Sequence, residues 1–263
     1  AKIGKRPAAY TGGIKKFFLF LLPGHISGLA ISMLIFPNVL LMPIVFAVAV
    51  ALLSKSILRV KIKGRSRHFL NPSNTGIAIS FILFPFVSVT PPYQFTEVPT
   101  GMADFIIPVI FIILGSFLNS KYTKKMPLIA AWLIAFFLQA VIRTSIMGTD
   151  TLAALGPMTG VAFLLFTFYM VSDPSTTPSK TSNQIFFGAS VAAVYSLLMA
   201  FHIVFGMFFS LLIVCSIRGA YFFVLNLVEK YKELEQQQRE SIRTSPVLSV
   251  APQLVSLRKQ QNK

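Results

Sequence analysis

Two short polar segments stand beside long apolar runs in this sequence, and their side chains are the groups best able to bind a ligand. The first is Asn71-Pro72-Ser73-Asn74-Thr75, and the second is Asp173-Pro174-Ser175-Thr176-Thr177. Asn or Asp at a helix cap, followed by Pro at the first helical position, starts a helix with free N–H groups and a partial positive charge. Two such helix ends predict a two-sided site for an anion, a phosphate or a polar heterocycle.

Asp173 is the acidic residue that adjoins an apolar run on the same side as the basic loops. An ionisable group at membrane depth is costly, so a functional role is one interpretation. A helix cap followed by proline is the other, because Asp-Pro is common at helix starts. The residue taken alone leaves both open.

The elements that position these segments belong to a membrane protein. Hydrophobic residues make up 54% of the 263 residues, charged residues only 12%, and the mean hydropathy is +0.71. The formal charge of +16 comes from Lys and Arg in short segments between apolar runs, which is a topology signal. We therefore expect the chain to lie in a lipid bilayer and to bind no nucleic acid.

Apolar segments predict an all-α polytopic fold with about eight transmembrane segments, each crossing needing roughly 20 residues. The third, sixth and seventh segments are short and flank the two polar segments, which predicts broken or tilted helices around a central site. The segments lie at about 17–36, 39–58, 75–90, 102–119, 127–146, 157–172, 185–201 and 203–225.

Basic residues gather on one side of these segments. Clusters at Lys15 and Lys16, in the 55–67 loop and at Lys121, Lys124 and Lys125 share that side, so the positive-inside rule predicts cytoplasmic termini. We expect a basic N-terminus, one transmembrane domain, a charged helical extension and a disordered basic tail. Their predicted ranges are 1–16, 17–226, 227–245 and 246–263.

Other candidate groups are given simpler interpretations. Cys215 is predicted to be a small core residue, and nothing places His25, His68 and His202 as haem ligands at matched depth. Arg143 and Arg218 are expected to reach the membrane surfaces, the alternative for Arg143 being a cavity shared with Gln139. Arg65, Arg67 and His68 precede Asn71 and are candidates to neutralise a ligand phosphate.

The two polar segments also carry a family resemblance. Asn71-Pro72, Gly76 and Phe84-Pro85 resemble the "NP…G…[YF]P" signature of the membrane subunits D of Rnf complexes and B of the sodium-pumping NADH:quinone oxidoreductase. The stretch "FYMVSDPSTTPSKTSNQIFFG" is similar to the second element of that family, at Met170, Asp173, Pro174 and Gly188. "HFLNPSN" and "PPYQFTE" resemble shortened members that accompany enediyne natural-product gene clusters.

This resemblance implies a urea-transporter-like inverted repeat in a bacterial cytoplasmic (inner) membrane. It also implies flavin binding and electron transfer within or across that membrane, with redox partner proteins or other membrane subunits. Relatives attach flavin mononucleotide to the Thr of an S-G-A-T element, which this sequence lacks, although Thr96 and Thr100 lie in the corresponding loop. We therefore expect non-covalent flavin mononucleotide or riboflavin.

The cofactor contacts are expected from the two polar segments and Gly76: Asn71, Pro72, Ser73, Asn74, Thr75, Gly76, Asp173, Pro174, Ser175, Thr176 and Thr177. Hydroxyl and amide groups satisfy a flavin without burying net charge. Two alternatives keep the fold and drop the redox role. One is a channel or carrier for a small polar solute, and the other is a flavin-free scaffold subunit.

Overall fold

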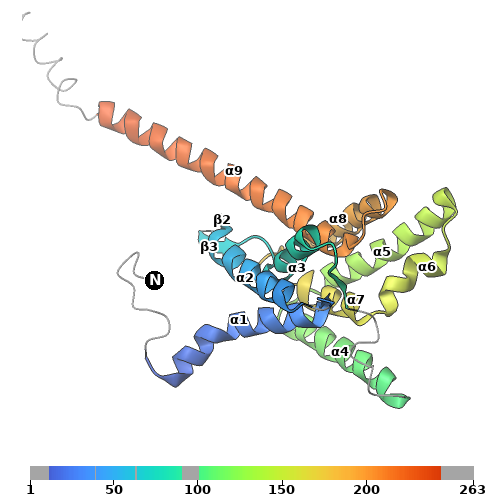
Figure 1. The fold of residues 1–263 in the computed structure, drawn as a ribbon. Helices are drawn as coiled ribbons and strands as arrows, with labels where there is room; N and C mark the ends of the chain where they lie inside the picture. Colours follow the sequence, from blue (N-terminus) through green and yellow to red (C-terminus); the bar gives the residue numbers. More distant parts are fainter. Residues whose placement is uncertain (1–11, 39, 63, 91–100, 244–263) are drawn as a thin grey trace, which may run out of the picture.

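The fold is described by a computed structural model covering residues 12–38, 40–62, 64–90 and 101–243. The tail predicted at 246–263, residues 1–11 of the basic N-terminus, and Thr96 and Thr100 lie outside the described residues. The described chain is mostly helical (Figure 1). Its helices are α1 (Ile14–Leu34), α2 (Met42–Ile57), α3 (Pro72–Leu83), α4 (Met102–Lys121), α5 (Met126–Met147), α6 (Thr151–Leu155), α7 (Val161–Leu165), α8 (Thr181–Ala200) and α9 (Gly206–Arg243).

Short strands supplement the helices in two places. Strand β1 (Ile35–Phe36) pairs antiparallel with β4 (Ser88–Val89), and β2 (Arg59–Ile62) pairs antiparallel with β3 (Arg65–His68). The second pair is the basic hairpin between α2 and α3. The all-α expectation therefore holds for the body of the fold, and the loops add strand pairs that satisfy their own backbone groups.

Helix length and composition are compatible with an all-α membrane protein. In the part of the chain that the structure describes, four helices are long and apolar enough to cross a membrane: α1, α5, α8 and the stretch Gly206–Glu240 of α9. A fifth span results if the bent pair Thr151–Thr159 and Val161–Met170 counts as one crossing. The apolar helices Met42–Ile57 and Phe105–Lys121 are shorter. Eight crossings and the inverted repeat stay predictions.

The predicted short segments have different outcomes. The sixth is a broken helix, since its two halves, joined at Gly160, are bent by 67°. The third corresponds to α3, which has only 12 residues. The prediction for the seventh was wrong, because α8 has 20 residues and begins at Thr181 with a polar first turn that hydropathy alone leaves out.

Two helix pairs pack at close range through glycine. A Cβ atom on Gly76 would lie 2.2 Å from the Ala47 carbonyl oxygen of α2, and one on Gly188 would lie 2.5 Å from the Leu128 carbonyl oxygen of α5. Small residues allow such backbone approach between membrane helices. These close approaches fix α3 against α2 and α8 against α5, and Figure 1 shows α3 near the centre of the bundle.

Aromatic side chains fill the core between these helices. Trp132 of α5 is fully buried and lies within ring-contact distance of Phe136, Phe163, Phe166 and Tyr195. Its indole N–H donates to the Thr167 hydroxyl at 3.0 Å, which satisfies the polar edge of the ring. Cys215 is also buried, as predicted.

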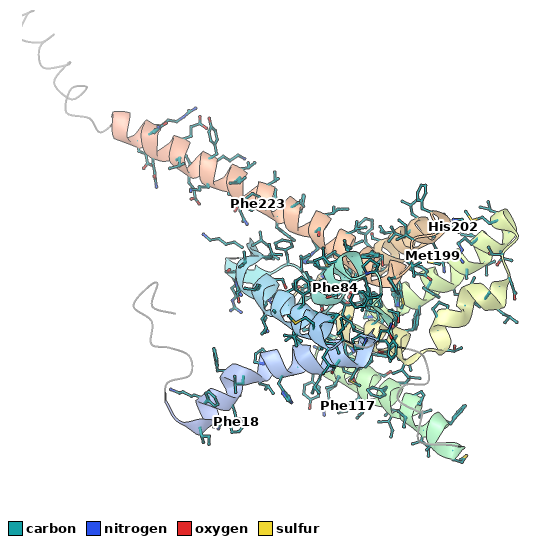
Figure 2. All side chains as sticks on the ribbon, in the orientation of Figure 1. Phe18, Phe84, Phe117, Met199, His202 and Phe223 are labelled. Atoms are coloured by element: carbon teal, nitrogen blue, oxygen red, sulfur yellow. The ribbon has the colours of Figure 1, made fainter. Side chains whose placement is uncertain are left out.

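Other aromatic residues face outward. Phe18, Phe117 and Phe223 are exposed and lie on α1, α4 and α9, the helices that extend away from the centre (Figure 2). Such an apolar exterior is costly in water and favourable in lipid. Helix α9 continues beyond the bundle to Arg243 with a charged sequence.

Candidate functional site

The first polar segment starts a helix, as predicted. Asn71 is the N-cap of α3, with an extended backbone and a side chain that accepts from the Asn74 N–H at 3.0 Å. Pro72 occupies the first helical position, and the Thr75 hydroxyl donates to the Asn71 carbonyl at 2.8 Å. Residues 70–78 are all buried, so this helix start lies inside the protein.

The second polar segment does not start a helix, and that prediction was wrong. Helix α8 begins eight residues later, at Thr181, and Asp173 is instead the first residue of a tight turn. Its Oδ1 accepts from the Ser175 N–H at 2.9 Å, and its carbonyl accepts from the Thr177 N–H at 3.1 Å. A second proline, Pro178, removes the backbone donor that a continuing helix would need.

The two segments contact each other, although 102 residues separate them in sequence. The Asn71 side-chain nitrogen lies 3.5 Å from Asp173 Oδ2 and donates to the Met170 carbonyl at 3.3 Å. The same carboxylate oxygen accepts from the Thr176 hydroxyl at 3.2 Å and lies 3.9 Å from His68 Nε2. Asp173 is therefore a hydrogen-bonded junction between both halves of the sequence.

A π-helical turn at Phe166–Met170 leads into this junction. Widened turns of this kind leave carbonyl groups for other donors and are frequent at functional sites. Here the Phe168 carbonyl accepts from Asn119 of α4 at 2.9 Å, and the Met170 carbonyl accepts from Asn71. Side chains from distant helices thus compensate for the irregular backbone.

Long side chains from distant elements hold carbonyl groups of the second segment and of the two residues that follow Thr177. Arg218 of α9 donates to the Thr176 carbonyl, and Lys125, at the start of α5, donates to the Pro178 carbonyl. Gln184 of α8 donates to the Ser179 and Lys124 carbonyls, both at 3.1 Å. These contacts replace the helical hydrogen bonds that the segment lacks.

Lys125 is buried at the entrance of α5. Burial, reinforced by the neighbouring Arg218 guanidinium, lowers the pKa of Lys125 to about 8. Its charge therefore changes in a pH range where an exposed lysine stays protonated. The sequence pattern predicts only a topology role for Lys125 and a position at the membrane surface for Arg218. Instead Arg218 turns toward the Thr176 carbonyl.

Both polar segments line one cavity, whose volume is about 610 Å³. Asn71, Pro72 and Ser73 contribute from the first segment, and Asp173 and Ser175 from the second. The apolar wall is formed largely by α1, with Phe111, Leu165, Tyr169 and Met170 opposite, and Lys55 and His68 add basic groups. We name this the junction cavity.

The remaining predicted site residues lie outside this lining. The Thr75 hydroxyl donates to the Asn71 carbonyl, and the Thr177 hydroxyl donates to the Asp173 carbonyl. Asn74 donates to the Phe208 carbonyl of α9 at 2.9 Å. Gly76 packs on α2, Thr176 donates to Asp173 and Pro174 is exposed. Except for the exposed Pro174, these residues hold the two segments in place rather than line the junction cavity.

The other basic residues considered for phosphate binding and the histidines considered for haem binding do not come together in the structure. Arg65 and Arg67 lie exposed on β3, so of that cluster His68 alone lines the cavity. His25 is exposed on α1 and His202 lies in the α8–α9 turn. Within the described ranges, no group of three His, Cys, Asp or Glu residues is placed to hold a metal ion.

Sequence reasoning missed Lys55, Tyr169, Lys125 and Gln184, which line or hold the junction cavity. Lys and Gln at helix ends have no distinguishing pattern, because their role depends on which loop packs beside them. No protein-family model matches the sequence, and no curated protein matches it.

Proposed function

We propose that this protein is a membrane electron-transfer subunit that binds a non-covalent flavin in the junction cavity. The supporting observation is that Asn71 and Asp173, distant in sequence, contact each other and line one cavity. When bound, a flavin supplies reversible electron transfer that no side chain of this cavity provides. The inverted-repeat arrangement, the bacterial inner membrane, electron supply to natural-product biosynthesis, and redox partners or other membrane subunits belong to the same proposal.

The residues present fit a flavin in size and in chemistry. A volume of about 610 Å³ lies within the usual range of roughly 300 to 1,000 Å³ for cofactor sites. The apolar wall from α1, with Tyr169 and Phe111, suits a flat aromatic ring system. The carboxylate, amide and hydroxyl groups of Asp173, Asn71 and Ser73 suit the polar ring edge and the ribityl hydroxyls.

Charge also supports a flavin. Lys55 and His68 line the cavity, and a phosphate group is compatible with these two basic side chains. Asp173 is the carboxylate of the lining, and its oxygens accept hydrogen bonds from Ser175 and Thr176. The cavity therefore accepts flavin mononucleotide as well as riboflavin without an unpaired buried carboxylate.

The direct test is the visible absorbance spectrum of the detergent-purified full chain, recorded before and after acid precipitation. We expect flavin bands that stay in the supernatant, either as purified or after incubation with riboflavin or flavin mononucleotide. Asp173→Asn keeps the shape of the side chain and removes its charge. We expect it to weaken flavin binding by about 1 to 3 kcal/mol.

Asp150→Asn is the matched control. Asp150 caps α6, where its side chain accepts from the Leu152 N–H, and it does not line the junction cavity. A wild-type protein that binds neither flavin would overturn the proposal. Equal flavin affinity in Asp173→Asn and Asp150→Asn would remove the role given to Asp173.

A channel or carrier for a small polar solute is the second candidate function. The 67° bend between Thr151–Thr159 and Val161–Met170 favours it, because transporters bind substrates at interrupted helices. Solute uptake by proteoliposomes whose protein carries no flavin would support this function. Flavin retention without solute uptake would support electron transfer.

A further inference from the structure

A second cavity lies at the other end of the bundle. Helix α5 begins at Met126, directly after Lys125, and its 22 residues extend about 33 Å, at 1.5 Å per residue, toward the second cavity. This cavity has a volume of about 510 Å³ and is lined by the end of α5, the end of α8 and the α8–α9 turn. We name it the distal cavity. The charge distribution predicts that this end is extracytoplasmic.

Arg143 lines the distal cavity, which is the alternative interpretation of this residue, although Gln139 is not part of the lining. The Arg143 guanidinium forms a hydrogen bond with the Tyr195 side chain, while its Nη1 atom is buried and has no hydrogen-bond partner. Among the described residues, no carboxylate lies within 4.0 Å of its guanidinium. A buried cationic N–H group without an acceptor is costly, and an anion bound in the cavity would supply that acceptor.

Other polar groups nearby also lack partners. The Thr149 hydroxyl lines the same cavity, is buried and has no hydrogen-bond partner. Gln139, one turn before Arg143 on α5, is 6% exposed, and both of its amide atoms are unpaired. Two unpaired donors in the lining, one of them positively charged, define where a negatively charged head group fits.

The α8–α9 turn supplies strained backbone at the cavity. His202 and Phe205 have φ values of 58° and 63°, in the left-handed region that residues other than glycine rarely adopt. Both line the cavity, and Figure 2 shows His202 beside Met199 at this turn. Strain of this kind persists where the surroundings impose it and is common at binding sites.

Most of the distal lining is apolar, including Met147, Pro157, Met199 and Val204. A small hydrophilic anion would leave these side chains without contacts. We infer that the distal cavity binds an amphipathic anion, whose carboxylate or phosphate group contacts Arg143 and Thr149 and whose apolar part lies along the methionine side chains. This site is separate from the junction cavity and does not depend on flavin.

The test uses the full chain, purified in detergent and stripped of lipid, with three probes. Oleate carries a carboxylate, phosphatidylglycerol carries a phosphate, and lysophosphatidylcholine has an apolar chain without net charge. Native mass spectrometry titrations give the affinity of each. We expect oleate, phosphatidylglycerol or both to bind, and lysophosphatidylcholine to bind at least about tenfold more weakly.

Arg143→Gln should reduce the affinity for the bound anion by about tenfold or more, since the buried cation is lost. Arg143→Lys should restore part of it. Arg239→Gln is the matched control, because Arg239 lies exposed on the extension of α9. Binding of phosphatidylglycerol alone would identify a lipid as the source of the anion, and binding of oleate alone would identify a free carboxylate.

Three results would overturn the inference: no anion binding by the wild type, equal affinities for the neutral lipid and the anions, or equal affinities in Arg143→Gln and Arg239→Gln. If Arg143→Gln fails to elute as a folded protein, Thr149→Val takes its place. That change removes the unpaired hydroxyl and keeps the side-chain volume. A severalfold loss of anion affinity is expected, and an unchanged affinity would count against the site.

Discussion

The two polar segments begin alike in sequence and differ in structure. Asn71-Pro72 starts α3 and is held by the helix itself, through the Asn74 N–H and the packing of Gly76 on α2. Asp173-Pro174 forms a turn held by Lys125, Gln184 and Arg218 from three other elements. The first segment thus depends on local hydrogen bonds and backbone packing, and the second on long side chains.

An Asn-Pro or Asp-Pro pair provides a local hydrogen-bond acceptor, and it does not by itself specify a helix. Whether a helix follows depends on the residues after it. Gly76, Ile77 and Ala78 continue α3 in buried positions. Pro178 and Ser179, which follow the second segment, do not form a helix. Four sets of substitutions test this difference between the two segments.

The largest effect is expected from Gly76→Val. The new Cβ would meet the Ala47 carbonyl oxygen at 2.2 Å, and backbone cannot move aside as a side chain can. We expect a loss of about 3 kcal/mol or more in unfolding free energy, or no folded protein. Thermal unfolding in detergent measures it, with Gly28→Val in α1, where nothing lies within 4 Å, as the control. Similar stability of both variants would contradict the packing argument.

Arg218→Met should loosen the second segment and leave the first intact. It removes the donor to the Thr176 carbonyl while keeping much of the apolar stem, so we expect a loss of about 1 to 3 kcal/mol. Thiol labelling of a cysteine placed at Ser175 should accelerate, and labelling at Ser73 should not. Equal acceleration at both positions would show that the two segments move together.

Lys125 should make stability depend on pH. Its pKa is lowered to about 8 in the folded protein from 10.5, so between these values the unfolded chain binds more protons. The free energy of unfolding therefore rises as pH increases from about 8 toward 10.5, by about 1 to 2 kcal/mol between pH 7.5 and 9.5. The difference in unfolding temperature between the wild type and Lys125→Met measures this dependence. Parallel pH curves for the two proteins would rule it out.

Asn71 variants should give the smallest effect and separate its two roles. Asn71→Ser keeps a good N-cap and removes the donor to the Met170 carbonyl, while Asn71→Ala removes both. We expect Asn71→Ala to be less stable than Asn71→Ser by about 1 kcal/mol. Chemical unfolding of the two variants gives the difference. Should their stabilities coincide, capping would contribute nothing to this buried helix start.

Local chemistry made part of this structure predictable from the sequence. The apolar segments match helices because buried or lipid-exposed backbone must pair its own N–H and C=O groups. Asn71 was predicted as a helix cap, because capping needs only a residue and its next three neighbours. The Gly160 break was signalled by a segment too short to span a membrane.

Tertiary structure alone decided the rest. The contact between Asn71 and Asp173, the burial of Lys125 and the partners of Arg218 depend on helices distant in sequence. The position of the Arg143 side chain also depends on tertiary structure, because it is long enough to reach either the membrane surface or the distal cavity. The hydropathy of the sequence predicts which segments are helical and apolar. The direction taken by a long polar side chain depends on which groups tertiary packing leaves without partners.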